Sequence, residues 1–533
     1  MLNRVDKEMK MEQSHSENTK RLAKNTLMLY SRMLFGMFVS LYTSRVVLNA
    51  LGVVDYGIFG AVGGFVSMFS LISNSLSSAV SRFLTFELGG GDMYRLKRAF
   101  STSLLIHILL AFVILLVAET VGIWFVNHRM TIPPDRLYAA NWVFQASILS
   151  FMFGLFSVPY NASIVSHERM SAFAYIGILD TTLKLIIVLF VANARCHFDK
   201  LIVYSILLTA VSILLQLIYL IYCRNHFEEC RLRLSFDKEF WKDISAFSMW
   251  NFIGCSASIL KDQGVNVLLN MFVGPVLNAA RGIAGSVNNA VASFAGNFMA
   301  ALNPQITKSF ASGDLTYAHF LVERGSRFSF YIMLFLALPI LLETEFILTL
   351  WLTEFPEHTS HFVRLVLVLS LLEVLSTTLI ILQNATGNIR NYQLVVGTTL
   401  LLNFPLSYIC LKSNLEPEST YIVAIVVSVM CMFARLLFVH RTAALSISSF
   451  VRNVVLNVIL VTICAMLFPY IAHAVLPYGW ERFVIVSIIS VCMSAISIFF
   501  IGCSRNERVY ISTRILAIIS RFFGGVYQKN IKD

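Results

Sequence analysis

Ionisable side chains inside long apolar segments are the residues of this sequence best placed to do chemistry. The deepest is Lys261, in NFIGCSASILKDQGVNVLLNMFVG. It lies about 15 residues from one end of a predicted helix and about 12 from the other, roughly 20 Å from either membrane surface at 1.5 Å per residue. A lysine side chain does not extend that far. Lys261 therefore requires a carboxylate partner, a water-filled cavity or an anionic ligand.

Four arginines lie in the same kind of segment: Arg32 and Arg45 in the first, Arg82 in the second and Arg281 in the eighth. Each lies near a helix end, so extension to the interface is an alternative role for it. Five cations with few carboxylates nearby favour an anionic ligand, and the guanidinium group suits phosphate. We therefore predict that Lys261 and these four arginines bind an anionic ligand with phosphate groups, which the resemblance described below specifies as a diphosphate.

Four further side chains are candidate sites for ion coupling. Asp180 and Lys184 are four residues apart in GILDTTLKL and can form a structural pair. Glu373, in LSLLEVLSTT, has no charged neighbour and is a candidate proton or cation site. Asp262 follows the deep lysine directly, but its side chain points about 100° away on a helix. No metal ligands and no cofactor are predicted.

The elements that position these residues are membrane helices. The chain has 533 residues, 57% hydrophobic and 13% charged, whereas a soluble domain carries about a quarter charged residues. Apolar runs recur along it, each near the roughly 20 residues that cross a bilayer. The net charge of +11 is explained by basic cytoplasmic loops, so a nucleic-acid partner is not expected. The nine cysteines are scattered and indicate neither disulfides nor a metal site.

About 14 transmembrane helices are predicted, with most basic residues in the connections after even-numbered helices. This arrangement places about 27 Lys and Arg residues on the inner side of the membrane and about 8 on the outer side. Because basic loops stay in the cytoplasm, it predicts cytoplasmic termini. No signal peptide is visible at the polar N-terminus. The predicted helix centres lie near residues 37, 69, 112, 148, 184, 211, 260, 290, 338, 373, 402, 430, 463 and 493.

An internal repeat divides these helices into two lobes. Residues 48–92 and 269–314 both begin Leu-Asn, continue through a Gly-containing apolar helix and end in Gly-Asp. Parallel repeats of six helices are a known transporter plan. The predicted fold is all-α and polytopic, with two pseudo-symmetric six-helix lobes plus two C-terminal helices. The predicted parts are an N-terminal tail (1–24), an N-lobe (25–222), a linker (223–245), a C-lobe (246–441), helices 13 and 14 (442–504) and a basic amphipathic tail (505–533).

Motifs for enzymatic chemistry are absent from the sequence. It contains no GxxxxGK[ST] phosphate loop, no HExxH, no GxSxG and no cluster of His and Cys at metal-ligand spacing. The predicted outer loops have at most about a dozen residues, too few to gather catalytic groups at one face. We therefore expect a protein that is not an enzyme, which disfavours a polysaccharide polymerase or ligase.

Three blocks resemble polysaccharide-biosynthesis membrane proteins: LYTSRVVLNALGVVDYGIFGAVGG (41–64), SRFLTFELGGGD (81–92) and the segment from KDQGVNVLLN to KSFASGD (261–314). The family is that of O-antigen (Wzx-type) flippases in the multidrug/oligosaccharidyl-lipid/polysaccharide exporter superfamily. The resemblance implies fourteen helices and a cationic cavity for a polyprenyl-diphosphate-linked oligosaccharide. It implies a bacterial cytoplasmic membrane, with lipids, glycosyltransferases and a polymerase as partners.

The leading hypothesis is a flippase for an O-antigen, capsule or exopolysaccharide unit that works by alternating access. The alternative within the superfamily is a cation-coupled multidrug antiporter, for which a negatively charged cavity is expected. The positive charge predicted on both lobes favours the flippase.

Overall fold

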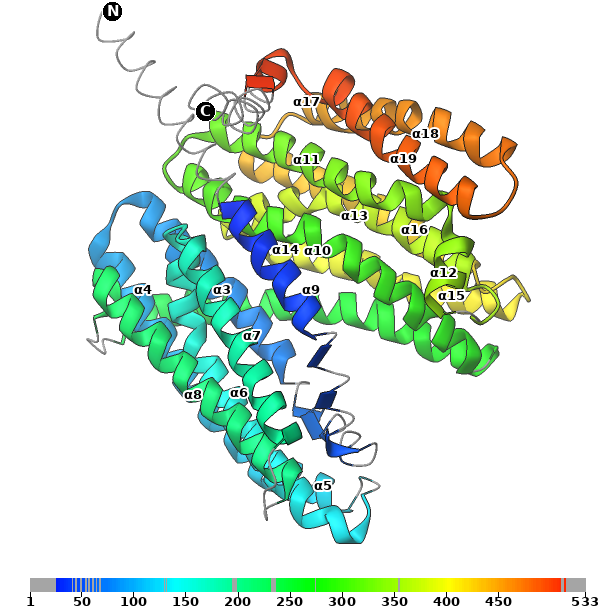
Figure 1. Cartoon of the computed structure of the whole chain (residues 1–533). Helices are drawn as coiled ribbons and strands as arrows, with labels where there is room; N and C mark the ends of the chain where they lie inside the picture. The colour runs from blue at the N-terminus through cyan, green and yellow to red at the C-terminus, as the bar shows by residue number, and fades with distance from the viewer. Residues whose placement is uncertain are drawn as a thin grey trace, which may run out of the picture. The chain divides into compact units, whose positions relative to one another are not determined.

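The computed structural model describes residues 25–509 and 512–513 apart from short gaps, and each element in that part is a helix (Figure 1). This confirms the predicted all-α fold. Arg45 lies outside the described residues, as do the N-terminal tail and most of the C-terminal tail. The gaps are 41, 44–45, 48–49, 53–54, 56–57, 60–61, 64, 67–68, 129, 131, 194–198, 232–235, 274 and 353–354.

The first group of helices runs from residue 70 to residue 226. A short π-helical turn, η1, joins α4 to α5 without a break in direction. The bounds are α3 (Ser70–Gly90), α4 (Met93–Val117), η1 (Ala118–Gly122), α5 (Ile123–His128), α6 (Leu137–Ser166), α7 (Met170–Asn193) and α8 (Lys200–His226).

The second group begins at residue 238. Every predicted span centre beyond residue 100 lies in a helix of the two groups except 402, the turn between α14 and α15. The bounds are α9 (Lys238–Phe272), α10 (Pro275–Ala311), α11 (Leu315–Leu342), α12 (Thr344–Leu352), α13 (Thr359–Thr386), α14 (Arg390–Leu401), α15 (Asn403–Lys412), α16 (Ser419–Ala443), α17 (Ile447–Phe450), η4 (Val451–Leu456), α18 (Asn457–Val475), α19 (Trp480–Ser497) and η5 (Ile498–Gly502).

The two Gly-Asp pairs of the repeat form the same kind of turn. Gly91 and Gly313 end their helices with φ of 78° and 79°, a backbone conformation that glycine adopts without steric cost. The aspartate after each glycine starts the next helix. Asp92 accepts from the backbone N–H groups of Tyr94 and Arg95, and Asp314 accepts from that of Tyr317. The local repeat in sequence is therefore a local repeat in structure.

Ten helical segments of the described chain are long and apolar enough to cross a membrane. The segments of α3, α9 and α10 are not among these ten, and α9 and α10 carry the polar and charged residues considered below. The last helices expose large apolar side chains, among them Ile463, Leu467 and Phe468 on α18. An apolar surface of this kind is stable in lipid and not in water. The chain is a multi-pass membrane protein.

The chain divides into two compact units, each with its own core. Helices α9, α10, α11, α13 and α14 contribute to both units. Unit 1 is built on fully buried side chains such as Val143 and Phe144 of α6, and unit 2 on side chains such as Leu367 of α13 and Val427 of α16. Unit 1 comprises Met1–Ile259, Asn297–Leu321 and Ile381–Thr398, and unit 2 comprises Leu260–Gly296, Val322–Ile380 and Thr399–Asp533.

Candidate functional site

A polar cavity of about 610 Å³ lies within unit 2. Helices α9, α10, α13 and α16 line it, together with Asn403 at the start of α15. A cavity of this volume is in the range that holds a small ligand or part of a larger one. Its charged residues are Lys261, Asp262, Arg281 and Glu373. All four were predicted from sequence as site residues, and the fold brings them together.

Lys261 is the most buried of the four charges. Its side chain is 6% exposed, and its Nζ lies 3.0 Å from Oε1 of Glu373 and 3.7 Å from Oδ1 of Asp262. The lysine therefore has two of the three features predicted for it, a carboxylate partner and a cavity. Glu373 has no charged neighbour along its own helix and finds its partner 112 residues away in sequence.

The two carboxylates differ from the lysine in their access to the cavity. The side chain of Glu373 is 40% exposed and that of Asp262 is 57% exposed. Both carboxylates are therefore more accessible from the cavity than the lysine that they flank.

Arg281 supplies the second cation of the cavity. Its guanidinium carbon lies 5.2 Å from the centre of the Tyr421 ring, a cation–π distance. It also interacts electrostatically with Asp262. The tyrosine is buried and comes from the first turn of α16, so Arg281 connects α10 with α16.

The charge of the cavity corrects one expectation from the sequence. We expected the cations to lie apart from the carboxylates, which would make the cavity positive. Two cations, Lys261 and Arg281, instead face two carboxylates, Asp262 and Glu373, and the four formal charges sum to zero. The sequence does not show this balance because Glu373 lies on a different helix, more than a hundred residues from Lys261.

Amide and hydroxyl groups complete the lining, and sequence reasoning did not single them out. The side-chain oxygen of Asn288 is buried and has no hydrogen-bond partner within the described residues. Such an oxygen is a ready acceptor for a ligand or a water molecule. The sequence offered one indication of them, the run of glycines and asparagines that lies within the predicted helix now seen as α10. The uncharged polar lining residues are Asn266, Asn288, Asn289, Ser370, Asn403, Thr420 and Tyr421.

Arg82 lies in unit 1 and not in this cavity. Its Nε and Nη2 donate to the backbone carbonyls of Asn384 and Ala385, each at 3.1 Å, near the end of α13. The guanidinium also lies over the rings of Phe83 and Phe86. A cation at the carbonyl end of a helix stabilises that end. Arg82 therefore caps the end of α13, a contact that the sequence did not predict, and its role in binding a diphosphate stays a prediction.

Arg32 and the Asp180–Lys184 pair also belong to unit 1. The Arg32 guanidinium lies 4.4 Å from the centre of the Phe173 ring on α7. The Asp180–Lys184 ion pair forms as predicted, at 2.8 Å within α7. Lys184 lines a separate cavity of about 360 Å³ together with serines of α6 and α8, such as Ser150. None of these side chains reaches the cavity of unit 2.

Comparisons with known proteins support the fold. No protein-family model and no curated protein sequence matches the chain. A MATE transporter crystallised with MaL6 has a TM-score of 0.66 at 13% identity, over 80% of this chain and 97% of that one. The outward-facing conformation of a multidrug resistance MATE family transporter of the MOP superfamily gives 0.65 and 14%, over 80% and 96%. This chain therefore has the fold of MATE transporters.

A third structure is that of a MOP superfamily transporter from Pyrococcus furiosus. It has a TM-score of 0.64 at 12% identity, over 80% of this chain and 96% of that one. Reverse polarity of its binding pocket is reported to suggest a different function for that protein. Proteins with this fold therefore differ in the polarity of their pockets. The substrate has to be inferred from the charges that line the cavity and not from the fold.

Proposed function

We propose that this protein is an ion-coupled membrane transporter whose substrate binds in the polar cavity of unit 2. The observation that carries the proposal is the pairing of a buried lysine, Lys261, with a half-buried carboxylate, Glu373, at 3.0 Å. Ionisable residues at membrane depth are costly and mark ligand or ion pathways. Access to the cavity alternates between the two sides of the membrane.

The balance of charges in the cavity couples ion binding to substrate binding. With all four groups ionised, the cavity is neutral and Lys261 is held by Glu373. Binding of a proton or a cation to Glu373 removes that partner and leaves the cavity with one net positive charge. An anionic substrate then gains the attraction of Lys261 and Arg281, and its release follows when Glu373 loses the ion.

The substrate that fits this cycle best is a polyprenyl-diphosphate-linked oligosaccharide. Lys261 and Arg281 hold the diphosphate, and the asparagine, serine, threonine and tyrosine groups of the lining bind sugar hydroxyls. The polyprenyl chain stays in the bilayer. The membrane is the bacterial cytoplasmic membrane with both termini in the cytoplasm, and glycosyltransferases and a polymerase act before and after the transporter.

A cation-coupled multidrug antiporter is the second candidate. The similarity to a multidrug resistance MATE transporter supports it, and the exposed carboxylates Asp262 and Glu373 are suitable groups for a cationic drug. Lys261 and Arg281 oppose it, because a cationic drug in this cavity meets two fixed positive charges.

Reconstitution in proteoliposomes distinguishes these functions. The purified protein is tested for translocation of a labelled lipid-linked oligosaccharide and for proton-driven uptake of a cationic dye. We expect the oligosaccharide to move and Lys261→Ala to abolish the movement. The matched control is Lys97→Ala, because Lys97 is an exposed residue paired with Glu228 outside the cavity. Dye transport without oligosaccharide movement supports the antiporter, and movement unchanged by Lys261→Ala refutes the assigned site.

A further inference from the structure

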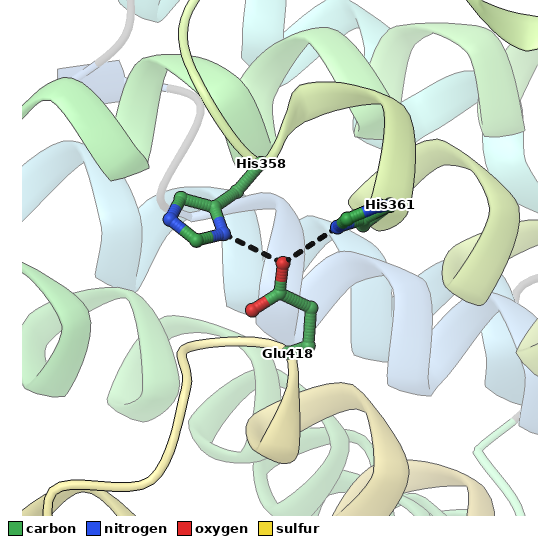
Figure 2. A group of neighbouring side chains, drawn as sticks. All are labelled: His358, His361 and Glu418. Atoms are coloured by element: carbon green, nitrogen blue, oxygen red, sulfur yellow. Dashed lines mark hydrogen bonds and ion pairs between the residues drawn. The ribbon is translucent and has the colours of Figure 1, made fainter.

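Three metal-ligating side chains lie together at the N-terminal ends of α13 and α16, in unit 2 (Figure 2). His358 and His361 come from the turn that starts α13, and Glu418 directly precedes α16. The Nδ1 atoms of His358 and His361 lie 2.6 Å and 3.0 Å from the same oxygen, Oε1 of Glu418. All three potential ligand atoms lie within 4.8 Å of one another.

The carboxylate of Glu418 is only partly satisfied by this arrangement. The residue is 8% exposed, and its second oxygen, Oε2, is buried without a hydrogen-bond partner in the described part of the chain. A buried carboxylate oxygen left without a partner is costly. Both imidazoles compete for the other oxygen, which Figure 2 shows between the two rings. A bound cation takes the shared oxygen as one ligand and each imidazole nitrogen as another, so the two rings no longer compete for one acceptor.

We propose that His358, His361 and Glu418 bind a transition-metal ion of the Zn²⁺ type. Two imidazole nitrogens and one carboxylate oxygen are ligands that zinc prefers, and a three-residue set leaves one position for water. The side chain of His361 is 59% exposed, so that position opens to solvent. Bonds of about 2.0–2.1 Å in a tetrahedral site separate the ligand atoms by about 3.3 Å. The two nitrogen–oxygen separations, 2.6 Å and 3.0 Å, therefore have to widen by about 0.7 Å and about 0.3 Å.

Backbone geometry holds the first ligand in place before any metal binds. His358 has φ of 66°, a left-handed conformation that costs a non-glycine residue free energy. This conformation ends the loop and turns the imidazole toward Glu418, while His361 follows one helical turn later. The third ligand is 57 residues further along the chain. Because of this separation, the spacing of the three residues in the sequence does not predict the site.

Zinc binding to the purified full-length protein in detergent tests the assignment. After treatment with a chelator, we expect one equivalent of Zn²⁺ to bind in calorimetry. Co²⁺ in its place is expected to give the visible absorption of a four- or five-coordinate site. His361→Ala should weaken binding by more than about 100-fold, since loss of an outer-shell partner alone costs 10–100-fold. The matched control is His128→Ala, because His128 is an exposed histidine stacked on Trp124 in unit 1.

A second variant separates the loss of a metal ligand from misfolding of the protein. Glu418→Gln keeps a neutral acceptor for the two imidazoles but removes the anionic ligand, so it should fold and lose Zn²⁺ binding. The thermal midpoint of the wild-type protein should rise with Zn²⁺, and that of Glu418→Gln should not. The proposal is overturned if the wild-type protein binds no Zn²⁺, or if His361→Ala and Glu418→Gln bind it as tightly as the wild-type protein does.

Discussion

Substitutions in the Lys261–Glu373 pair should have unequal effects on stability, because the two side chains are buried to different degrees. Glu373→Gln leaves a lysine that is 6% exposed, with Asp262 at 3.7 Å as its remaining partner. Removing one member of a buried pair costs about 3–5 kcal/mol, and the second carboxylate reduces this to about 2 kcal/mol. Lys261→Met leaves a glutamate that is 40% exposed and stays hydrated, so its cost is at most about 1 kcal/mol.

The double variant separates stability from transport. With both charges removed, no buried ion lacks a partner, so the double variant should unfold at a higher temperature than Glu373→Gln alone. Transport should be lost in all three variants, because the charge change that couples ion and substrate needs both groups. Thermal unfolding in detergent and oligosaccharide movement in proteoliposomes measure the two properties. The reasoning fails if Glu373→Gln is as stable as Lys261→Met, or if the double variant transports.

Three further predictions concern unit 1. Gly387 has φ of 75°, and a Cβ there would clash with Nη2 of Arg82, so Gly387→Ala should destabilise the fold by about 1–2 kcal/mol in thermal unfolding. Gly90→Ala, which meets no atom within 4 Å, is its control and should be neutral or stabilising. Arg82→Ala should cost about 2–3 kcal/mol in the same assay because it removes two charge-assisted hydrogen bonds to carbonyls. Burial raises the pKa of Asp199, but hydrogen bonds from Arg136 outweigh it and hold the pKa below its ordinary value. A carboxyl group with a lowered pKa stabilises the fold above about pH 4, and this stabilisation is lost as the pH falls, so Asp199→Asn should lower the thermal midpoint at neutral pH and change it less in acid.

Hydropathy was sufficient to predict the all-α membrane class, because a membrane helix is specified locally by about 20 apolar residues. The Gly-Asp turns at Asp92 and Asp314 were equally local, since a left-handed glycine and a capping aspartate lie next to each other in the chain. Depth along the helix was also sufficient to single out Lys261, which the structure places in the cavity with its side chain buried.

The pairing of charges could not be predicted in the same way. Which helix faces Lys261 depends on packing between segments more than a hundred residues apart, and Glu373 carries no local signal of its partner. Arg82 shows the same limit, because its position near a helix end did not reveal that two backbone carbonyls of another helix accept hydrogen bonds from it. Apolar periodicity specifies which face of a helix is buried, and it does not specify the polar group on the neighbouring helix.

The cavity and the proposed metal site share two helices of one unit, which leads to a last prediction. On α13, Glu373 lies 12 residues after His361, or about 18 Å along the axis. On α16, Tyr421 lies one turn after Glu418. A metal that joins the starts of α13 and α16 therefore stiffens the end of unit 2 without bridging to unit 1. Saturating Zn²⁺ should stabilise the protein by about 2.7 kcal/mol at 100 times its Kd, while the maximal transport rate stays the same. A Zn²⁺-dependent loss of transport that His361→Ala abolishes would instead show that α13 and α16 must move apart during the cycle.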